Sequence, residues 1–207
     1  MYPDNRFITL EGIEGVGKST HVEAVVDALR ARGRGTVRTR EPGGSPVADR
    51  IRSLLLDPGG DPPLAETELL LLFAARSEHL ARVIRPALDS GQHVVCDRFT
   101  DATYAYQGGG RGLSPSRIAA LEAWVQGDLR PGRTILLDAP VPVALERARG
   151  RGAADRFERE ATAFFERARS VYLERARAEP GRFHVIDAAG PVDRVRDEIV
   201  AAALEDP

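Results

Sequence analysis

Hydrophobic residues are grouped along the chain in short runs and in longer stretches with helical spacing. In the segment that starts at Phe157, apolar side chains recur at spacings of three and four up to Tyr172, which predicts one helix face. The stretch from Thr67 to about Leu88 is also predicted to be helical. The short runs are predicted to be buried strands: Arg6–Leu10, Thr36–Arg40, His93–Cys96, Thr134–Leu137 and Phe183–Ile186.

Strands alternate with helices, which predicts an α/β fold with a five-stranded parallel sheet flanked by helices. No linker rich in Pro and Ser divides the 207 residues, so a single domain over residues 1–207 is expected. An acidic residue follows each predicted strand, and these acids should gather at the sheet edge where open α/β sheets bind ligands. We favour helix capping for Asp138 and Asp187, and a role in the site for Asp97 and Glu41. The fifth of these acids is Glu11.

Composition and charge exclude several classes of protein. With 43% hydrophobic residues and a net charge of −2, the chain is neither disordered nor suited to neutralising many nucleic-acid phosphates. We expect no membrane span, because the longest apolar run, Leu69 to Ala75, is far shorter than the roughly 20 residues that a span needs. The start of the chain lacks the shape of a signal peptide, and Cys96 is the single cysteine. A cytoplasmic location is therefore expected.

A phosphate-binding motif follows the first predicted strand. The segment Gly12-Ile-Glu-Gly-Val-Gly-Lys-Ser19 fits G-x-x-x-x-G-K-[ST], in which backbone N–H groups and a helix N-terminus surround phosphate oxygens. Lys18 would reach the β- and γ-phosphates, and Ser19 would offer its hydroxyl to Mg²⁺. Since Lys18 is the one lysine among 29 basic residues, the chain has no Asn/Thr-Lys-x-Asp element for guanine, which favours ATP. The expected nucleotide-binding residues are Gly12, Ile13, Glu14, Gly15, Val16, Gly17, Lys18, Ser19 and Thr20.

Four further segments accompany this P-loop in a characteristic order. They are Thr39-Arg-Glu-Pro-Gly-Gly44, Asp97-Arg-Phe99, Tyr104-Ala-Tyr-Gln-Gly-Gly-Gly-Arg-Gly112 and the arginine-rich run 147–158. Over essentially its whole length the chain closely resembles the bacterial thymidylate kinases, which belong to the P-loop nucleoside monophosphate kinases. The resemblance implies transfer of a phosphoryl group from MgATP to dTMP, giving dTDP and ADP for dTTP synthesis. It also implies a homodimer and a short arginine-rich lid at about 147–158.

The resemblance assigns roles around the acceptor phosphate. Arg98 is similar to the residue that holds this phosphate, a task that suits a bidentate guanidinium, and Arg52 would assist it. Asp97 and Glu41 would orient Mg²⁺-bound waters or Arg98 itself, with Asp97 joining Ser19 at the metal. Glu14 would approach the 3′-hydroxyl of the deoxyribose as a hydrogen-bond acceptor.

The thymine pocket is implied on the long helix and after the third strand. Arg76 can donate to a thymine carbonyl, and Thr103 can satisfy the ring N–H. Some family members place phenylalanine four residues before this arginine, where this chain has Leu72, with Phe73 beside it. We favour Phe73 as the stacking residue, with Leu72 as the alternative. The remaining residues of the implied pocket are Tyr106, against the sugar, and Gln107.

Phosphoryl transfer also needs positive charge on the moving group. The variable positions of the P-loop carry no basic residue, so the resemblance implies that the lid supplies the charge. Arg151 is the preferred catalytic residue, with Arg149 and Arg156 as alternatives, and Arg147 is expected to stack on adenine.

Two other functions are compatible with the P-loop. A kinase of a nucleoside or small metabolite would need a general base, which Glu41 or Asp97 could supply. A nucleotide-binding switch without an acceptor would leave Arg98, Tyr106 and Gln107 unexplained. The histidines show no catalytic partners in the sequence and are interpreted as structural: His21, His79, His93 and His184.

Overall fold

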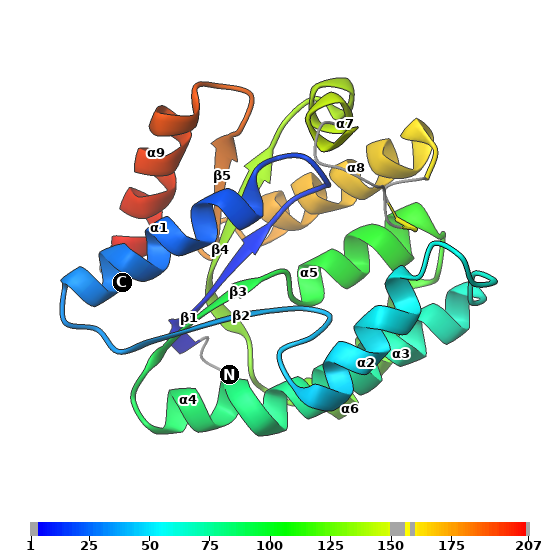
Figure 1. The fold of residues 1–207 in the computed structure, drawn as a ribbon, viewed down its shortest axis with the longest axis horizontal. Helices are drawn as coiled ribbons and strands as arrows, with labels where there is room; N and C mark the ends of the chain where they lie inside the picture. The colour runs from blue at the N-terminus through cyan, green and yellow to red at the C-terminus, as the bar shows by residue number, and fades with distance from the viewer. Residues whose placement is uncertain (1–3, 150–155, 158–159, 206–207) are drawn as a thin grey trace.

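Five parallel strands form the sheet of this computed structural model, which describes residues 4–149, 156–157 and 160–205. The strand order is β2-β3-β1-β4-β5, and both the sheet and its flanking helices were predicted (Figure 1). Each predicted run lies within a strand, but four strands also contain the acid that was expected to follow them. The bounds are β1 (Asp4–Glu11), β2 (Thr36–Arg40), β3 (His93–Asp97), β4 (Pro131–Asp138) and β5 (Phe183–Asp187).

Helices cover both faces of this sheet (Figure 1). Helices α1 and α9 pack against each other on one face, and α8 lies on the other face with α5 and η2. Helices α2, α3 and α6 form a separate group beside the carboxyl ends of β2 and β3. Within the described ranges, no helix combines the length and the apolarity that crossing a bilayer requires. The helices are α1 (Lys18–Ala31), α2 (Pro46–Leu56), α3 (Ala65–His79), η1 (Leu80–Ile84), α4 (Arg85–Asp89), α5 (Thr100–Thr103), η2 (Tyr104–Gly110), α6 (Pro115–Gln126), α7 (Val141–Arg149), α8 (Thr162–Ala178) and α9 (Val192–Leu204).

The two helical predictions had different outcomes. The stretch from Thr67 to Leu88 is helical throughout, with the π-helical turn η1 joining α3 to α4. The helix predicted from Phe157 begins only at Thr162, because Ala161 has extended backbone angles (φ −67°, ψ 151°). Phe157 lies in a turn before the helix, and its ring packs edge-on against Tyr106 with centroids 6.0 Å apart. Its apolar character therefore reflects burial rather than a helix face.

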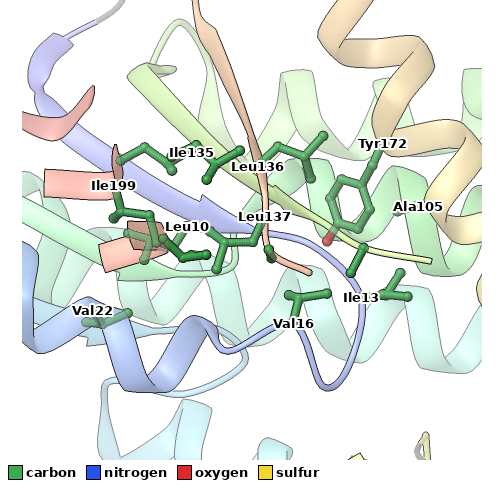
Figure 2. Close-up of a cluster of buried hydrophobic side chains, with 14 of the residues drawn as sticks. Leu10, Ile13, Val16, Val22, Ala105, Ile135, Leu136, Leu137, Tyr172 and Ile199 are labelled. Carbon is green, nitrogen blue, oxygen red and sulfur yellow. The ribbon is translucent and has the colours of Figure 1, made fainter. Parts of the chain in front are cut away.

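The main hydrophobic core also anchors the P-loop. Figure 2 shows Leu10 and Leu137 of neighbouring strands in one cluster with Val22 of α1. Ile13 and Val16, inside the loop after β1, are buried in the same cluster. Their side chains therefore fix the loop to the core while its backbone remains available for phosphate.

Strand register gathers the acids at one edge of the sheet, as predicted. Asp97 of β3 is in register with Leu10 and Arg40, and Asp138 is in register with Asp187. Asp138 accepts two hydrogen bonds from Arg169 of α8, at 2.7 and 2.8 Å.

A buried carboxylate ties α5 to α8 and to the start of β5. Asp101 accepts hydrogen bonds from Arg175 Nε at 2.5 Å and from Arg182 Nη1 at 2.7 Å. Arg182 also donates to Thr134 Oγ1 of β4 at 2.6 Å. Because the carboxylate is only 1% exposed, the two arginines would lose their compensating charge if it were removed.

We expect Asp101→Asn to lower the free energy of unfolding by about 3 kcal/mol, the usual effect of removing one partner of a buried ion pair. Asp138→Asn is the matched control, because its bidentate pair with Arg169 is partly solvated and should cost about 1 kcal/mol or less. Urea denaturation at pH 7 measures both values. Equal losses in the two variants would show that burial of the Asp101 network does not determine its contribution.

Candidate active site

The P-loop has a backbone that requires glycine. Gly15 and Gly17 have φ angles of +80° and +95°, which side chains disfavour. A Cβ at Gly15 would also lie 1.8 Å from the carbonyl oxygen of Ala144 in α7. Helix α1 begins at Lys18 with no side-chain cap, so its first N–H groups are available to an anion. Thr20 follows in the first turn and is exposed.

The ammonium of Lys18 is held inside this loop. Its Nζ donates to the carbonyl oxygens of Gly12 at 2.9 Å and Ile13 at 2.7 Å. Burial, followed by the charge of Arg98, lowers the pKa of Lys18 to about 8. The lone lysine of the chain therefore remains mostly charged at pH 7.

The oxygen-bearing side chains of Ser19 and Asp97 lie together beside the loop. The Ser19 hydroxyl donates to Asp97 Oδ2 at 3.1 Å. Asp97 Oδ1 is buried and has no hydrogen-bond partner among the described residues. Mg²⁺ binds through few protein oxygens and completes its shell with water and phosphate, so this pair fits that ion.

Arg98 reaches the P-loop from a strained backbone. It is the one non-glycine residue with positive φ (+70°) in the described part of the chain. Its guanidinium donates to Gly12 O at 2.9 Å and to Glu14 Oε1 at 2.5 Å. The same group lies 4.9 Å from the ring centroid of Tyr106. These contacts direct Arg98 across the space between the loop and η2.

The carboxylate of Glu11 supports that strained segment from beneath. It accepts hydrogen bonds from the Phe99 backbone N–H and from the Tyr172 hydroxyl, both at 2.7 Å. Burial, together with the charge of Asp101, raises the pKa of Glu11 to about 8. Glu11 thus fixes the residue that follows Arg98.

A cavity of about 710 Å³ extends from the P-loop to α3. Its walls come from the P-loop, the carboxyl ends of β2 and β3, and the helices α2, α3 and η2. The structure therefore brings most residues of the predicted site around one space. Those that line it are Glu14, Gly15, Gly17, Lys18, Ser19, Glu41, Arg52, Arg76, Asp97, Arg98, Thr103, Tyr106 and Gln107.

Arg76 closes the far end of this cavity and is held on every side. Its Nε donates to Glu41 Oε2 at 2.7 Å, and its Nη2 donates to Thr103 Oγ1 at 2.9 Å. The guanidinium lies 4.8 Å from the ring centroid of Phe73 and 4.9 Å from that of Phe99. A side chain fixed in this way presents its donors in a set direction.

The prediction that Phe73 lines the site is wrong. Phe73 is buried with Leu69 and Ile118 between α3 and α6, whereas Leu72 lines the cavity. The reason is helical phase: positions 72 and 76 share one face of α3, and position 73 faces Leu69, one turn earlier. Phe73 therefore contributes to the cavity only indirectly, because its ring packs against the guanidinium of Arg76.

The role expected for Glu41 is also corrected. Its carboxylate was expected near Mg²⁺ or Arg98, but it binds Arg76 and lies 3.0 Å from His79 Nδ1. Although burial alone would raise the pKa of Glu41, Arg76 and His79 hold it below its ordinary value. His79 was assigned no partner in the sequence, yet its position three residues after Arg76 places both on one helix face.

The arginine-rich run is described only in part, and Arg151 lies outside the described residues. Arg149 is exposed at the end of α7. Arg147 donates to the carbonyl oxygens of Ala188 at 2.6 Å and Ala189 at 3.0 Å, just after β5. This places its guanidinium at the carboxyl edge of the sheet.

Arg156 points away from the P-loop in this structure. Its Nη2 donates to Glu68 of α3 at 2.5 Å, and its Nε donates to Leu55 O of α2 at 2.8 Å. The buried carboxylate of Glu68 also accepts from Gln107 Nε2 at 2.8 Å. Arg156 and the cavity-lining residue Gln107 therefore share one acid.

Comparison with known proteins identifies the family. The model of the family described as "Thymidylate kinase" matches residues 10–199. The chain belongs to the thymidylate kinase family. It is 60% identical over 202 residues to the thymidylate kinase of Pseudomonas savastanoi pv. phaseolicola, covering 96% of each chain. It is 63% identical over 183 residues to that of Pseudomonas syringae pv. syringae, covering 88% of this chain and 87% of the relative.

A solved thymidylate kinase supports the same assignment. The crystal structure of the enzyme from Ehrlichia chaffeensis superimposes with a TM-score of 0.75 at 32% identity. The match covers 97% of this chain and 98% of the other. The family fold, a P-loop NTPase fold, therefore extends over nearly all of the sequence.

The pKa of Lys18 predicts how nucleotide binding depends on pH. Above pH 8 Lys18 of the free enzyme loses its proton, whereas Lys18 beside bound phosphates stays protonated. The affinity for ATP should therefore fall by up to about tenfold per pH unit. Calorimetric titration with ATP from pH 7 to 9.5 measures the slope. Lys18→Arg should bind more weakly but lose the slope, because a guanidinium stays charged. An equal slope in both proteins would assign the titration to Glu11 instead.

Proposed function

We propose that this chain transfers the γ-phosphoryl group of ATP to dTMP, giving ADP and dTDP for dTTP synthesis. One observation carries the proposal: a single cavity joins the P-loop to a pocket that ends on Arg76 and Thr103. A triphosphate in the loop and a nucleotide in the pocket would then face each other across Arg98. Membership in the thymidylate kinase family supports thymidine monophosphate as the acceptor.

The acceptor phosphate would be held by arginines. Arg98 provides a guanidinium fixed by Glu14 and Gly12, and Arg52 lines the same cavity with its Nη1 on Pro42 O at 2.9 Å. Both can offer parallel N–H donors to phosphate oxygens. In this arrangement Glu14 would orient Arg98 and would also accept a hydrogen bond from the 3′-hydroxyl of the sugar.

The base end suits a pyrimidine with two ring carbonyls. Arg76 would donate to the ring, Thr103 and Gln107 would exchange hydrogen bonds with it, and Leu72 would provide apolar contact; all four side chains line the cavity. The ring of Tyr106 would lie against the sugar and leave little room for a 2′-hydroxyl. The donor set at Arg76 favours a carbonyl over an amino group at the same ring position.

The chemistry needs positioning and charge rather than a general base. The attacking group is a phosphate oxygen that is already anionic, so Lys18 and Arg98 can act by aligning reactants and stabilising the transition state. Ser19 and Asp97 would hold Mg²⁺, which when bound neutralises charge on the β- and γ-phosphates. Residues 147–158 would supply further charge, with Arg151 first, Arg149 and Arg156 as alternatives, and Arg147 on adenine.

Residues 1–207 would act as one kinase unit in the cytoplasm, where both nucleotide substrates occur, and we propose that two copies pair. Two exposed apolar side chains lie on the packed helices α3 and α6, namely Leu70 of α3 (56% exposed) and Trp124 of α6 (83% exposed). The ion pair of Glu66 with Arg117 marks the same outer surface of the two helices. A second copy would cover this surface.

An acceptor panel tests the proposed reaction. The protein is mixed with MgATP and each of dTMP, dUMP, UMP, CMP, AMP, GMP and thymidine, and release of ADP is followed. We expect dTMP to be the best acceptor. Some turnover of dUMP is compatible with this, because one methyl group contributes only about 1–3 kcal/mol. A preference for thymidine or another nucleotide would overturn the proposed acceptor, and ATP binding without acceptor-dependent turnover would favour a switch.

Trp124→Glu is expected to convert the dimer to a monomer, because the charge would be buried at the surface shared by α3 and α6. Val192→Glu is the matched control, since Val192 is also apolar and 63% exposed but lies on α9. Sedimentation equilibrium gives the mass of each variant. The proposed surface is wrong if the wild type is dimeric and Trp124→Glu keeps the dimer.

A further inference from the structure

His79 is a buried titratable side chain that lies beside the cavity and has no part in the proposed reaction. It is fully buried at the end of α3 and does not line the cavity. Its two ring nitrogens have separate partners, Glu41 Oε1 at 3.0 Å and Thr39 Oγ1 at 2.6 Å. A histidine used only for packing would not need both.

The partners determine how the ring is protonated. An ionised Glu41 can only accept, so Nδ1 of His79 must carry a proton and donate to it. In the neutral ring, Nε2 then accepts from the Thr39 hydroxyl. Hydrogen bonding therefore assigns one orientation to the imidazole.

The second oxygen of Glu41 connects His79 to a side chain that lines the cavity. Glu41 Oε2 accepts from Arg76 Nε at 2.7 Å while Oε1 faces His79. With both oxygens engaged, the carboxylate plane is fixed, and the guanidinium that it binds is fixed with it. Thr39, His79, Glu41 and Arg76 thus form a linear chain of contacts that ends at the cavity wall.

The motif Thr39-Arg-Glu-Pro-Gly-Gly44 is built around this chain of contacts. Thr39 and Glu41 are its two partners for His79, and Gly44 packs directly against the ring. A Cβ at Gly44 would lie 2.6 Å from His79 Cδ2 and 2.6 Å from Thr39 Oγ1. Three of the six motif positions therefore contact His79, and none of the three needs to touch a phosphate.

We propose that His79 is a positioning residue for base recognition. By donating from Nδ1 to Glu41, it fixes the orientation of this carboxylate. The carboxylate in turn directs the guanidinium of Arg76 toward the carbonyl of the base. The inference rests on the proposed function, because it takes Arg76 as the group that contacts thymine. It adds a determinant of acceptor specificity that lies outside the cavity.

Two amide substitutions separate the two hydrogen bonds of the ring. His79→Asn places an amide nitrogen near the position of Nδ1 and keeps the bond to Glu41, whereas His79→Gln reaches toward Thr39 and loses it. For His79→Gln we expect the KM for dTMP to rise about tenfold, as for the loss of a hydrogen bond to a charged group. The ratio of kcat/KM for dTMP over dCMP should fall by a similar factor, because dCMP has an amino group in place of one carbonyl. His79→Asn should stay within about threefold of wild type, and the KM for ATP should change less than twofold in both.

A purely structural role predicts a different pattern, in which both amides lower thermal stability equally and leave the dTMP-to-dCMP ratio unchanged. That result would overturn the proposal. If His79→Gln does not fold, Thr39→Val takes its place, because it keeps the side-chain volume and removes only the hydrogen bond to His79 Nε2. This variant should lower the dTMP-to-dCMP ratio of kcat/KM by about threefold. An unchanged ratio in that variant would also overturn it.

Arg76→Gln separates this failure from failure of the proposed function. If Arg76→Gln loses the preference for dTMP while His79→Gln keeps it, Arg76 contacts the base and only the role of His79 is wrong. If Arg76→Gln also keeps the preference, thymine recognition at Arg76 itself is wrong, and the inference about His79 falls with it.

Discussion

The pairing of arginine with carboxylate, buried at one end of the cavity and partly buried at the other, is the interaction on which the cavity depends. Arg76 is held by Glu41, and Arg98 is held by Glu14. A guanidinium removed from water is costly unless a partner compensates its charge, and the partner also fixes its direction. The cavity therefore holds several cations in fixed directions, so the nucleotides of the proposed reaction would require little reorganisation on binding.

The single lysine fits this scheme by contrast. Arginine serves wherever a planar donor can lie against a carboxylate or an aromatic ring, as Arg98 does with Glu14 and Tyr106. Inside the P-loop the available partners are two adjacent carbonyl oxygens, those of Gly12 and Ile13. A compact ammonium can reach both and can turn toward phosphate, whereas a broad, rigid fork has no comparable geometry there.

Much of the fold could be predicted because its signals are local. Buried runs such as His93–Cys96 and the glycines of the P-loop are visible within a few residues of sequence. The errors at the site involve either a phase difference of one residue, as for Phe73, or contacts between distant segments. Glu41 lies 35 residues from Arg76 and 38 from His79 along the chain, so no spacing rule connects Glu41 to either side chain.

The two ends of the cavity also differ in whether their residues are close together in the sequence. This difference explains what each kind of sequence evidence can identify. The phosphate end depends on backbone conformation at Gly15 and Gly17 and on two loop side chains buried in the core. Such a site is encoded within one short motif, so the motif alone identifies a triphosphate. The proposed base end is assembled from Glu41 after β2 and from residues of α3 and α5, each held by a partner from another element. Identifying the acceptor therefore requires resemblance along the whole chain, because no single segment contains the pocket.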